Sequence, residues 1–80
     1  MQLYTLYTKS NCKFCVMAKK LLIDNDELFE EVDISITDHK QNMFDKVKNS
    51  GAPIPKTVPQ IFQDDKYIGG YTELKDYMDS

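Results

Sequence analysis

The sequence predicts a small α/β domain in which a mixed β-sheet carries helices on its faces. Near the N-terminus a strand, an amphipathic helix and a second strand follow one another, and such a βαβ unit places its two strands parallel through a right-handed crossover. Near the C-terminus two short apolar runs flank Asp64 and Asp65, a turn pair that predicts an antiparallel hairpin. Helical patterns before and after the hairpin complete the order βαβ, helix, ββα, and a sheet with both kinds of pairing is mixed.

Two segments flanking the first helix have the pattern of strands. The opening stretch MQLYTLYT is rich in aromatic, β-branched and leucine residues, which predicts a mostly buried strand. In the stretch LFEEVDIS, Val32 and Ile34 alternate with Glu31 and Asp33. This alternation predicts a strand with one apolar and one polar face.

The first helix is indicated by Cys15, Ala18 and Leu22, which recur at the spacing of one helical face. Ser10 and Asn11 stand just ahead of the cysteines, and residues of these types commonly cap helix N-termini. We therefore expect an amphipathic helix that begins near the cysteines and turns its charged residues to solvent.

Two further amphipathic helices are predicted. The second should begin near Thr37 or Asp38, where an acidic residue suits a helix start, and it should stop at Gly51. Its buried side chains should be Met43, Phe44 and Val47. Thr72 can cap the last helix. The apolar face of that helix should carry Leu74, Tyr77 and Met78.

Composition excludes several classes of protein. The formal net charge is −3 and no basic cluster extends beyond Lys19 and Lys20, so a nucleic-acid partner is not expected. No apolar run approaches the roughly 18 residues of a membrane span, and the N-terminus lacks a secretory signal. We expect a single cytoplasmic domain over residues 1–80 with no membrane partner. In a reducing cytosol a close cysteine pair is more often redox-active or metal-binding than structural.

The only two cysteines, Cys12 and Cys15, fall where the first strand leads into the first helix. Unpaired N–H groups at a helix start, together with the helix dipole, favour a thiolate over a thiol. Lys9 and Lys13 act in the same direction, so the pKa of Cys12 should lie below the value of about 8.5 of a free cysteine. Cys15 lies one turn further in, on the apolar face. An exposed attacking sulfur and a shielded resolving sulfur are what dithiol exchange requires.

The cysteine pair has two other interpretations. Half of a zinc site would need further ligands, but the chain has no second CxxC and its one histidine, His39, stands at the start of another helix. Two cysteines could also be inert core residues. Their placement at a helix start favours redox chemistry over both, and His39 is given no role.

Three motifs, YTKSNCKFCVMAKKLL, TVPQIF and IGGYTEL, follow one another in an order and separation that resemble a dithiol glutaredoxin. The resemblance covers nearly the whole chain. It implies the thioredoxin fold, with four strands in the order 2-1-3-4 and three helices. It also implies a glutathione-dependent thiol-disulfide oxidoreductase that reduces protein disulfides and glutathione mixed disulfides, with Cys12 attacking and Cys15 resolving. Ribonucleotide reductase is a client by family precedent.

The resemblance further implies a glutathione site. A cis bond between Val58 and Pro59 would turn the Val58 N–H and C=O toward the cysteines, where they can pair with extended glutathione. The helix start after Gly69 and Gly70 would offer N–H groups to the γ-glutamyl carboxylate, and Glu73 would meet the ligand's ammonium. The contacts expected from the family are Lys9, Phe14, Thr57, Val58, Pro59, Gly70, Tyr71, Thr72 and Glu73. The glycine carboxylate would lie toward Lys9, with Lys56 assisting.

The chain departs from the family between the cysteines, where Lys13 and Phe14 replace the usual proline and tyrosine. The added cation should favour the Cys12 thiolate and give a more oxidising couple. Phe14 keeps the aromatic contact without the hydroxyl. Absence of the proline also accompanies occasional [2Fe-2S] binding between two subunits in this family; otherwise we expect a monomer with no metal and no tightly bound cofactor.

Two functional alternatives stay open. One is a glutaredoxin-like protein recharged directly by thioredoxin reductase. The other is a binding module that keeps the fold and uses its groove without turnover.

Overall fold

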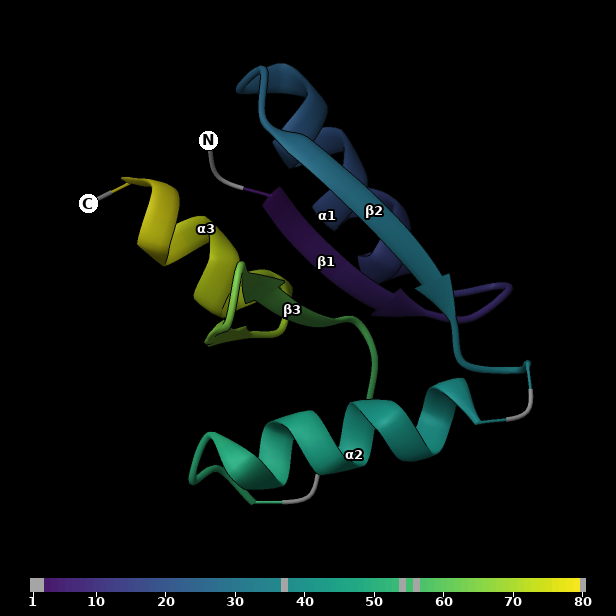
Figure 1. Ribbon diagram of the computed structural model, residues 1–80. Coiled ribbons are helices and arrows are strands. Elements are labelled where there is room, and N and C mark those ends of the chain that lie inside the picture. The colour runs from purple at the N-terminus through teal and green to yellow at the C-terminus, as the bar shows by residue number, and fades with distance from the viewer. Residues whose placement is uncertain (1–2, 37, 54, 56, 80) are drawn as a thin grey trace.

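The computed structural model describes residues 3–36, 38–53, 55 and 57–79. The elements in chain order are β1 (Leu3–Thr8), α1 (Lys13–Asp24), β2 (Leu28–Asp33), α2 (His39–Asn49), β3 (Gln60–Gln63), β4 (Lys66–Gly69) and α3 (Tyr71–Asp79). The sheet has the order β2-β1-β3-β4, with β1 parallel to β2 and β3 antiparallel to both of its neighbours (Figure 1). The predicted element order, sheet order and mixed pairing are confirmed.

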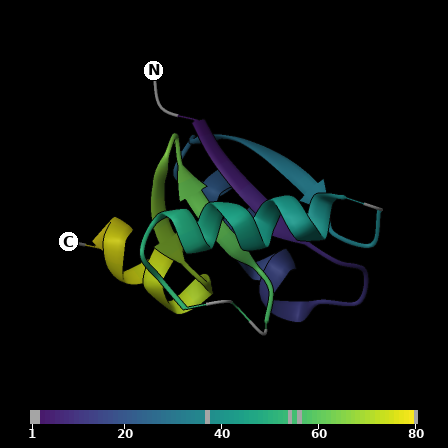
Figure 2. The same cartoon turned by 60° about the horizontal axis from the view of Figure 1, so that its bottom comes forward.

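The sheet is covered on both faces, by α1 and α3 on one side and by α2 on the other (Figures 1 and 2). Side chains of successive strand residues point to opposite faces, so each strand contributes to two cores. The core under α1 and α3 contains Tyr4, Leu6, Ala18, Leu22, Ile61 and Leu74. The core under α2 contains Tyr7, Met43, Val47 and Phe62. The first strand is therefore buried on both faces, as predicted.

The apolar face of α1 is as predicted, because Cys15, Ala18 and Leu22 are all buried. The predicted cap is wrong. Asn11 adopts a positive φ of 59°, which turns the chain before the helix, and the cap position then falls on Cys12. Cys12 has extended backbone angles, and its own sulfur accepts the Cys15 N–H. The chain thus places a cysteine at the N-cap, in place of the Ser10 or Asn11 cap that was predicted.

The second helix starts where the sequence predicts and differs from the prediction in one core residue. Asp38 is the N-cap, with a φ of 79° and no side-chain cap bond, while Thr37 lies outside the described residues. Met43 and Val47 are buried, but Phe44 is only half-buried because it sits at the edge of the apolar stripe. The helix ends two residues before Gly51. Gly51 follows the last helical turn and adopts a φ of +91°.

The hairpin and the last helix complete the fold. The turn between β3 and β4 lies at Asp64, which adopts a φ of 51°, and the two strands are antiparallel as predicted. Leu74 is fully buried in α3. Thr72 does not cap this helix, because it lies within the first turn, and the Gly70 N–H instead donates to Glu73 Oε1 at 2.7 Å. This contact is one half of a capping box. No helix among the described residues has the length and apolar character needed to cross a membrane.

Candidate redox site

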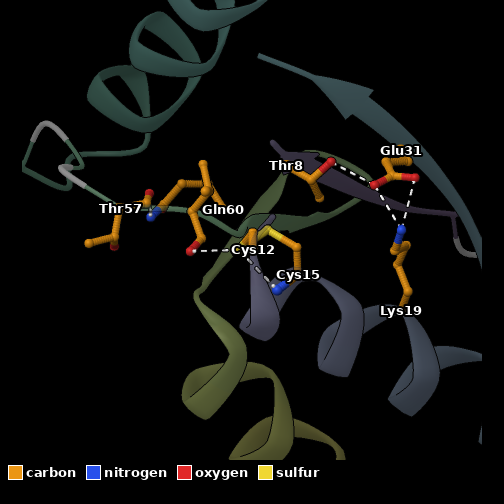
Figure 3. Close-up of a disulfide and its surroundings, with 8 residues drawn as sticks. Thr8, Cys12, Cys15, Lys19, Glu31, Thr57 and Gln60 are labelled. Atoms are coloured by element: carbon orange, nitrogen blue, oxygen red, sulfur yellow. Dashed lines mark hydrogen bonds and ion pairs between the residues drawn. A yellow bond between two sulfur atoms is a disulfide. The ribbon is translucent and has the colours of Figure 1, made fainter. Parts of the chain in front are cut away.

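Cys12 and Cys15 form a disulfide at the N-terminus of α1, with their Cα atoms 5.2 Å apart (Figure 3). Cys12 is half-buried, whereas Cys15 is only 2% exposed. The difference in access between the two cysteines has the predicted direction. Cys12 is therefore the sulfur that a bulky disulfide can approach from solvent.

The surroundings of Cys12 are polar backbone groups. The Cys15 N–H donates to Cys12 Sγ at 3.2 Å, and the Val58 carbonyl oxygen lies 3.6 Å from the same sulfur. In the reduced protein this N–H and the helix dipole would stabilise a thiolate at Cys12. The Val58 carbonyl can accept a hydrogen bond from the thiol. The Val58 backbone thus lies directly beside the sulfur, and its bond to Pro59 is cis as the resemblance implied.

A groove of about 300 Å³ opens next to Val58, and we call it the Tyr71 groove. It is lined by Phe14, Thr57, Val58, Pro59, Gly70, Tyr71, Thr72 and Glu73. These are all of the expected glutathione contacts except Lys9. Three segments that are distant in the sequence, at the starts of α1, β3 and α3, are therefore brought to one concave surface.

Aromatic rings and a carboxylate shape the Tyr71 groove. The ring of Phe14, which is 52% exposed, and the ring of Tyr71 lie with centroids 6.1 Å apart at an interplanar angle of 33°. Glu73 Oε1 accepts the Gly70 N–H. The Gly70 N–H, which precedes the N–H groups expected to bind a ligand carboxylate, is thus taken by a side chain of the chain itself. The first-turn N–H groups of α3 that follow Gly70 have no partner one turn earlier in the helix and are suited to bind an anion.

Lys9 lies outside the Tyr71 groove and lines a neighbouring hollow of about 210 Å³, which we call the Lys40 pocket. The Lys40 pocket is lined by Lys9, Ile34, Lys40, Met43, Phe44, Pro55, Thr57 and Val58. Lys40 was not identified from the sequence, because the motifs are weakest through α2. Lys40 and Lys9 line the same pocket only because α2 packs beside the segment before β3. Lys56 lies outside the described residues.

A third hollow, of about 620 Å³, borders both cysteines on the side of α1 and β2. There the buried Thr8 hydroxyl donates to Glu31 Oε2 at 2.7 Å, and Lys19 Nζ lies 3.1 Å from the same oxygen (Figure 3). The Thr8 hydrogen bond, with a further contribution from Lys19, holds the pKa of Glu31 below its usual range. The sequence placed Glu31 on the polar face of its strand but gave no signal for these partners.

Metal ligands do not gather around the disulfide in the part of the chain that the structure describes. Within residues 3–36, 38–53, 55 and 57–79, no group of three or more His, Cys, Asp or Glu side chains is placed to hold a metal ion. His39 is the first residue of α2, and its Nδ1 lies 3.0 Å from the Asp33 carbonyl oxygen. The described residues therefore supply no further ligands for the half zinc site considered from the sequence.

Comparisons with known proteins agree with this arrangement. The family model described as Glutaredoxin matches residues 4–68. Glutaredoxin 1 of Rickettsia felis is 39% identical over 72 residues, which cover 89% of this chain and 67% of that protein. The crystal structure of glutaredoxin 1 from Francisella tularensis, complexed with cacodylate, is 37% identical with a TM-score of 0.81, and the match covers 99% of this chain and 94% of that one. The buckwheat glutaredoxin–glutathione complex, 22% identical, has the same fold with a TM-score of 0.75 over 95% of this chain and 68% of that one.

Proposed function

The chain belongs to the glutaredoxin family and is a thiol-disulfide oxidoreductase, and on that premise we propose that glutathione supplies the electrons for its Cys12–Cys15 pair. One observation carries the proposal. The Tyr71 groove gathers residues from three separate segments at the side of Val58, whose carbonyl oxygen lies 3.6 Å from Cys12 Sγ. A tripeptide that pairs with Val58 would therefore present its sulfur to Cys12.

The polar ends of glutathione match the two sides of Val58. The γ-glutamyl carboxylate would lie at the start of α3, where N–H groups and the helix dipole favour an anion. The cysteinyl residue would pair with the Val58 backbone as an added strand and pack against Phe14 and Tyr71. The glycine carboxylate would lie toward Lys9, with the ammonium of Lys40 in the same hollow.

The proposed reaction is an exchange of disulfides. The Cys12 thiolate attacks one sulfur of a client disulfide, and the other client sulfur leaves as a thiolate and takes up a proton. Cys15 then loses its proton and attacks Cys12 Sγ, which releases the second client thiolate and leaves the Cys12–Cys15 disulfide seen in the structure. One glutathione thiolate attacks Cys12 Sγ, which opens this disulfide and releases the Cys15 thiolate. A second glutathione thiolate then attacks the sulfur of the bound glutathione, which releases oxidised glutathione and the Cys12 thiolate. In the reduction of a glutathione mixed disulfide, Cys12 attacks the glutathione sulfur and the client thiol leaves.

The clients are disulfide-bearing or glutathionylated proteins of the cytoplasm. The protein acts on them as a monomer. Ribonucleotide reductase is one such client, because it is a client in the family that the three motifs resemble. In that role the protein serves electron transport and cellular redox homeostasis.

A coupled assay separates the proposal from its rivals. The pre-reduced protein is mixed with the glutathione mixed disulfide of a small thiol, and NADPH oxidation is followed with either glutathione and glutathione reductase or thioredoxin reductase alone. We expect turnover with the first system. Turnover only with thioredoxin reductase would show that the protein is recharged directly by that enzyme, and absence of turnover with both systems would favour the binding module.

A further inference from the structure

The Lys40 pocket and the Tyr71 groove share a wall. Thr57 and Val58 line both of them. A peptide that pairs with Val58 in strand fashion runs from one hollow to the other, because an added strand lies along the segment with which it pairs. The sulfur of Cys12, 3.6 Å from the Val58 carbonyl oxygen, fixes the reacting cysteine of that peptide at the junction.

The Lys40 pocket has an apolar floor and a basic rim. Met43 is 2% exposed and forms the floor with the half-buried Ile34 and Phe44. Lys9 and Lys40 stand at its rim, and Lys40 Nζ lies 5.7 Å from the centre of the Phe44 ring. No carboxylate is present among its described lining residues. The pocket therefore suits an apolar side chain that is followed by a negative charge.

Glutathione leaves the floor of this pocket unused. If its γ-glutamyl end occupies the Tyr71 groove, the only residue that follows its cysteine is glycine, which has no side chain. The pocket holds about 210 Å³, which is below the roughly 300 to 1,000 Å³ of typical small-molecule pockets. Its size fits one side chain of a longer peptide.

We propose that the Lys40 pocket selects protein clients whose reacting cysteine is followed by an apolar residue and then by a glutamate or aspartate. The client would run in the direction assigned to glutathione, with residues before its cysteine in the Tyr71 groove and residues after it in the Lys40 pocket. This inference rests on the proposed exchange at Cys12. It does not require that glutathione be the reductant.

The test uses the pre-reduced full chain without glutathione, in a single turnover. The substrates are symmetrical disulfides of the blocked peptides Ser-Cys-Leu-Glu, Ser-Cys-Gly-Glu, Ser-Cys-Leu-Lys and Ser-Cys-Gly-Lys. Each reaction converts one peptide disulfide into two peptide thiols while the protein dithiol becomes the Cys12–Cys15 disulfide, so atoms and electrons balance. We expect the Leu-Glu peptide to react about tenfold faster than the Gly-Lys peptide, with about fivefold of this from the glutamate.

Variants assign the preference to the pocket. Lys40→Glu should abolish the glutamate preference, whereas the matched control Lys48→Glu, an exposed lysine on the same helix, should keep it. Phe44→Ala should reduce the leucine preference and keep the glutamate preference. Ile34→Ala gives the same test if loss of Phe44 prevents folding. Equal rates for all four peptides, or a glutamate preference that survives Lys40→Glu, would overturn the inference.

The two proposals fail separately. If the peptide preference is found but glutathione does not recharge the protein, the Lys40 pocket stands and the glutathione proposal is wrong. If glutathione supports turnover and the peptides show no preference, the glutathione proposal stands and the proposal for the Lys40 pocket is wrong.

Discussion

Glu73 Oε1 accepts a hydrogen bond of 2.7 Å from the Gly70 N–H, so an acidic side chain of the chain itself stands at the start of α3. Gly69 makes room for this contact. A Cβ at Gly69 would lie 2.8 Å from both Cβ and Cγ of Glu73, and its φ of +126° is one that other residues rarely adopt. Glu73 therefore orders the turn between β4 and α3, and this turn forms one wall of the Tyr71 groove.

Replacing Glu73 separates its role in the turn from its charge. Glu73→Gln keeps an oxygen that can accept the Gly70 N–H, so stability should change by less than about 0.5 kcal/mol. The KM for glutathione should rise about two- to fivefold, because the ligand's ammonium loses a carboxylate partner. Glu73→Ala should in addition lose about 1 kcal/mol of stability, the usual value of a capping contact. Thermal denaturation and glutathione kinetics of both variants measure these effects. A lower KM in Glu73→Gln would instead show that Glu73 competes with the ligand.

Trapping with oxidised glutathione should distinguish the two sulfurs. Cys15→Ser retains the accessible Cys12 but has no resolving thiol, so it should accumulate one glutathione per chain. Cys12→Ser retains only Cys15, which is 2% exposed, and should accumulate little. Intact-protein mass spectrometry reads both results. Equal labelling of the two variants would contradict the assignment of Cys12 as the attacking sulfur.

Features that depend on neighbouring residues in the sequence were predicted well. The placement of Cys12 and Cys15 at a helix start, the burial of Ala18 and Leu22 and the hairpin turn at Asp64 all follow from local patterns. The three motifs also identified the lining of the Tyr71 groove, because their resemblance to the family carried information on how distant segments meet.

Features that depend on exact backbone angles or on packing between elements were not predicted. The cap of α1 moved to Cys12 because Asn11 adopts a left-handed conformation that its residue type permits but does not require. The Lys40 pocket depends on the approach of α2 to the segment before β3, and no motif marks that contact.

Lys13→Pro should make the redox couple more reducing. Lys13 is exposed and is the first residue of α1, a position where proline fits because its missing N–H has no helical partner. The substitution removes a cation beside Cys12 that favours the thiolate of the reduced form. A charge contribution of about 0.3 to 1 kcal/mol corresponds to a shift of roughly 6 to 20 mV toward more negative potential.

Lys13→Ala separates the charge from the stiffness of the proline ring. It should shift the potential in the same direction as Lys13→Pro. Equilibration of each variant with glutathione redox buffers gives the potentials. A shift to more positive potential in both variants would show that Lys13 does not stabilise the reduced form.

The contact between Thr8 and Glu31 should make stability depend on pH in the acid range. The Thr8 hydrogen bond holds the pKa of Glu31 below its usual range, and Lys19 acts in the same direction while burial opposes both. A carboxylate whose pKa is lower in the folded chain stabilises the fold above its unfolded pKa of about 4.3, and this stabilisation is lost as pH falls through the folded value.

The stability advantage of the wild type over Glu31→Gln should therefore be present at pH 6 and shrink as the pH falls below about 4.3. Its size should stay below about 1 kcal/mol, since the Glu31 side chain is 38% exposed and solvent screens the Lys19 pair. Thr8→Val removes the largest cause of the pKa shift. The stability advantage of Thr8→Val over the double variant Thr8→Val/Glu31→Gln should therefore depend less on pH. Chemical denaturation of the four proteins at pH 6 and pH 3 makes the comparison. An advantage of the same size at both pH values would mean that Glu31 acts through its shape rather than its charge.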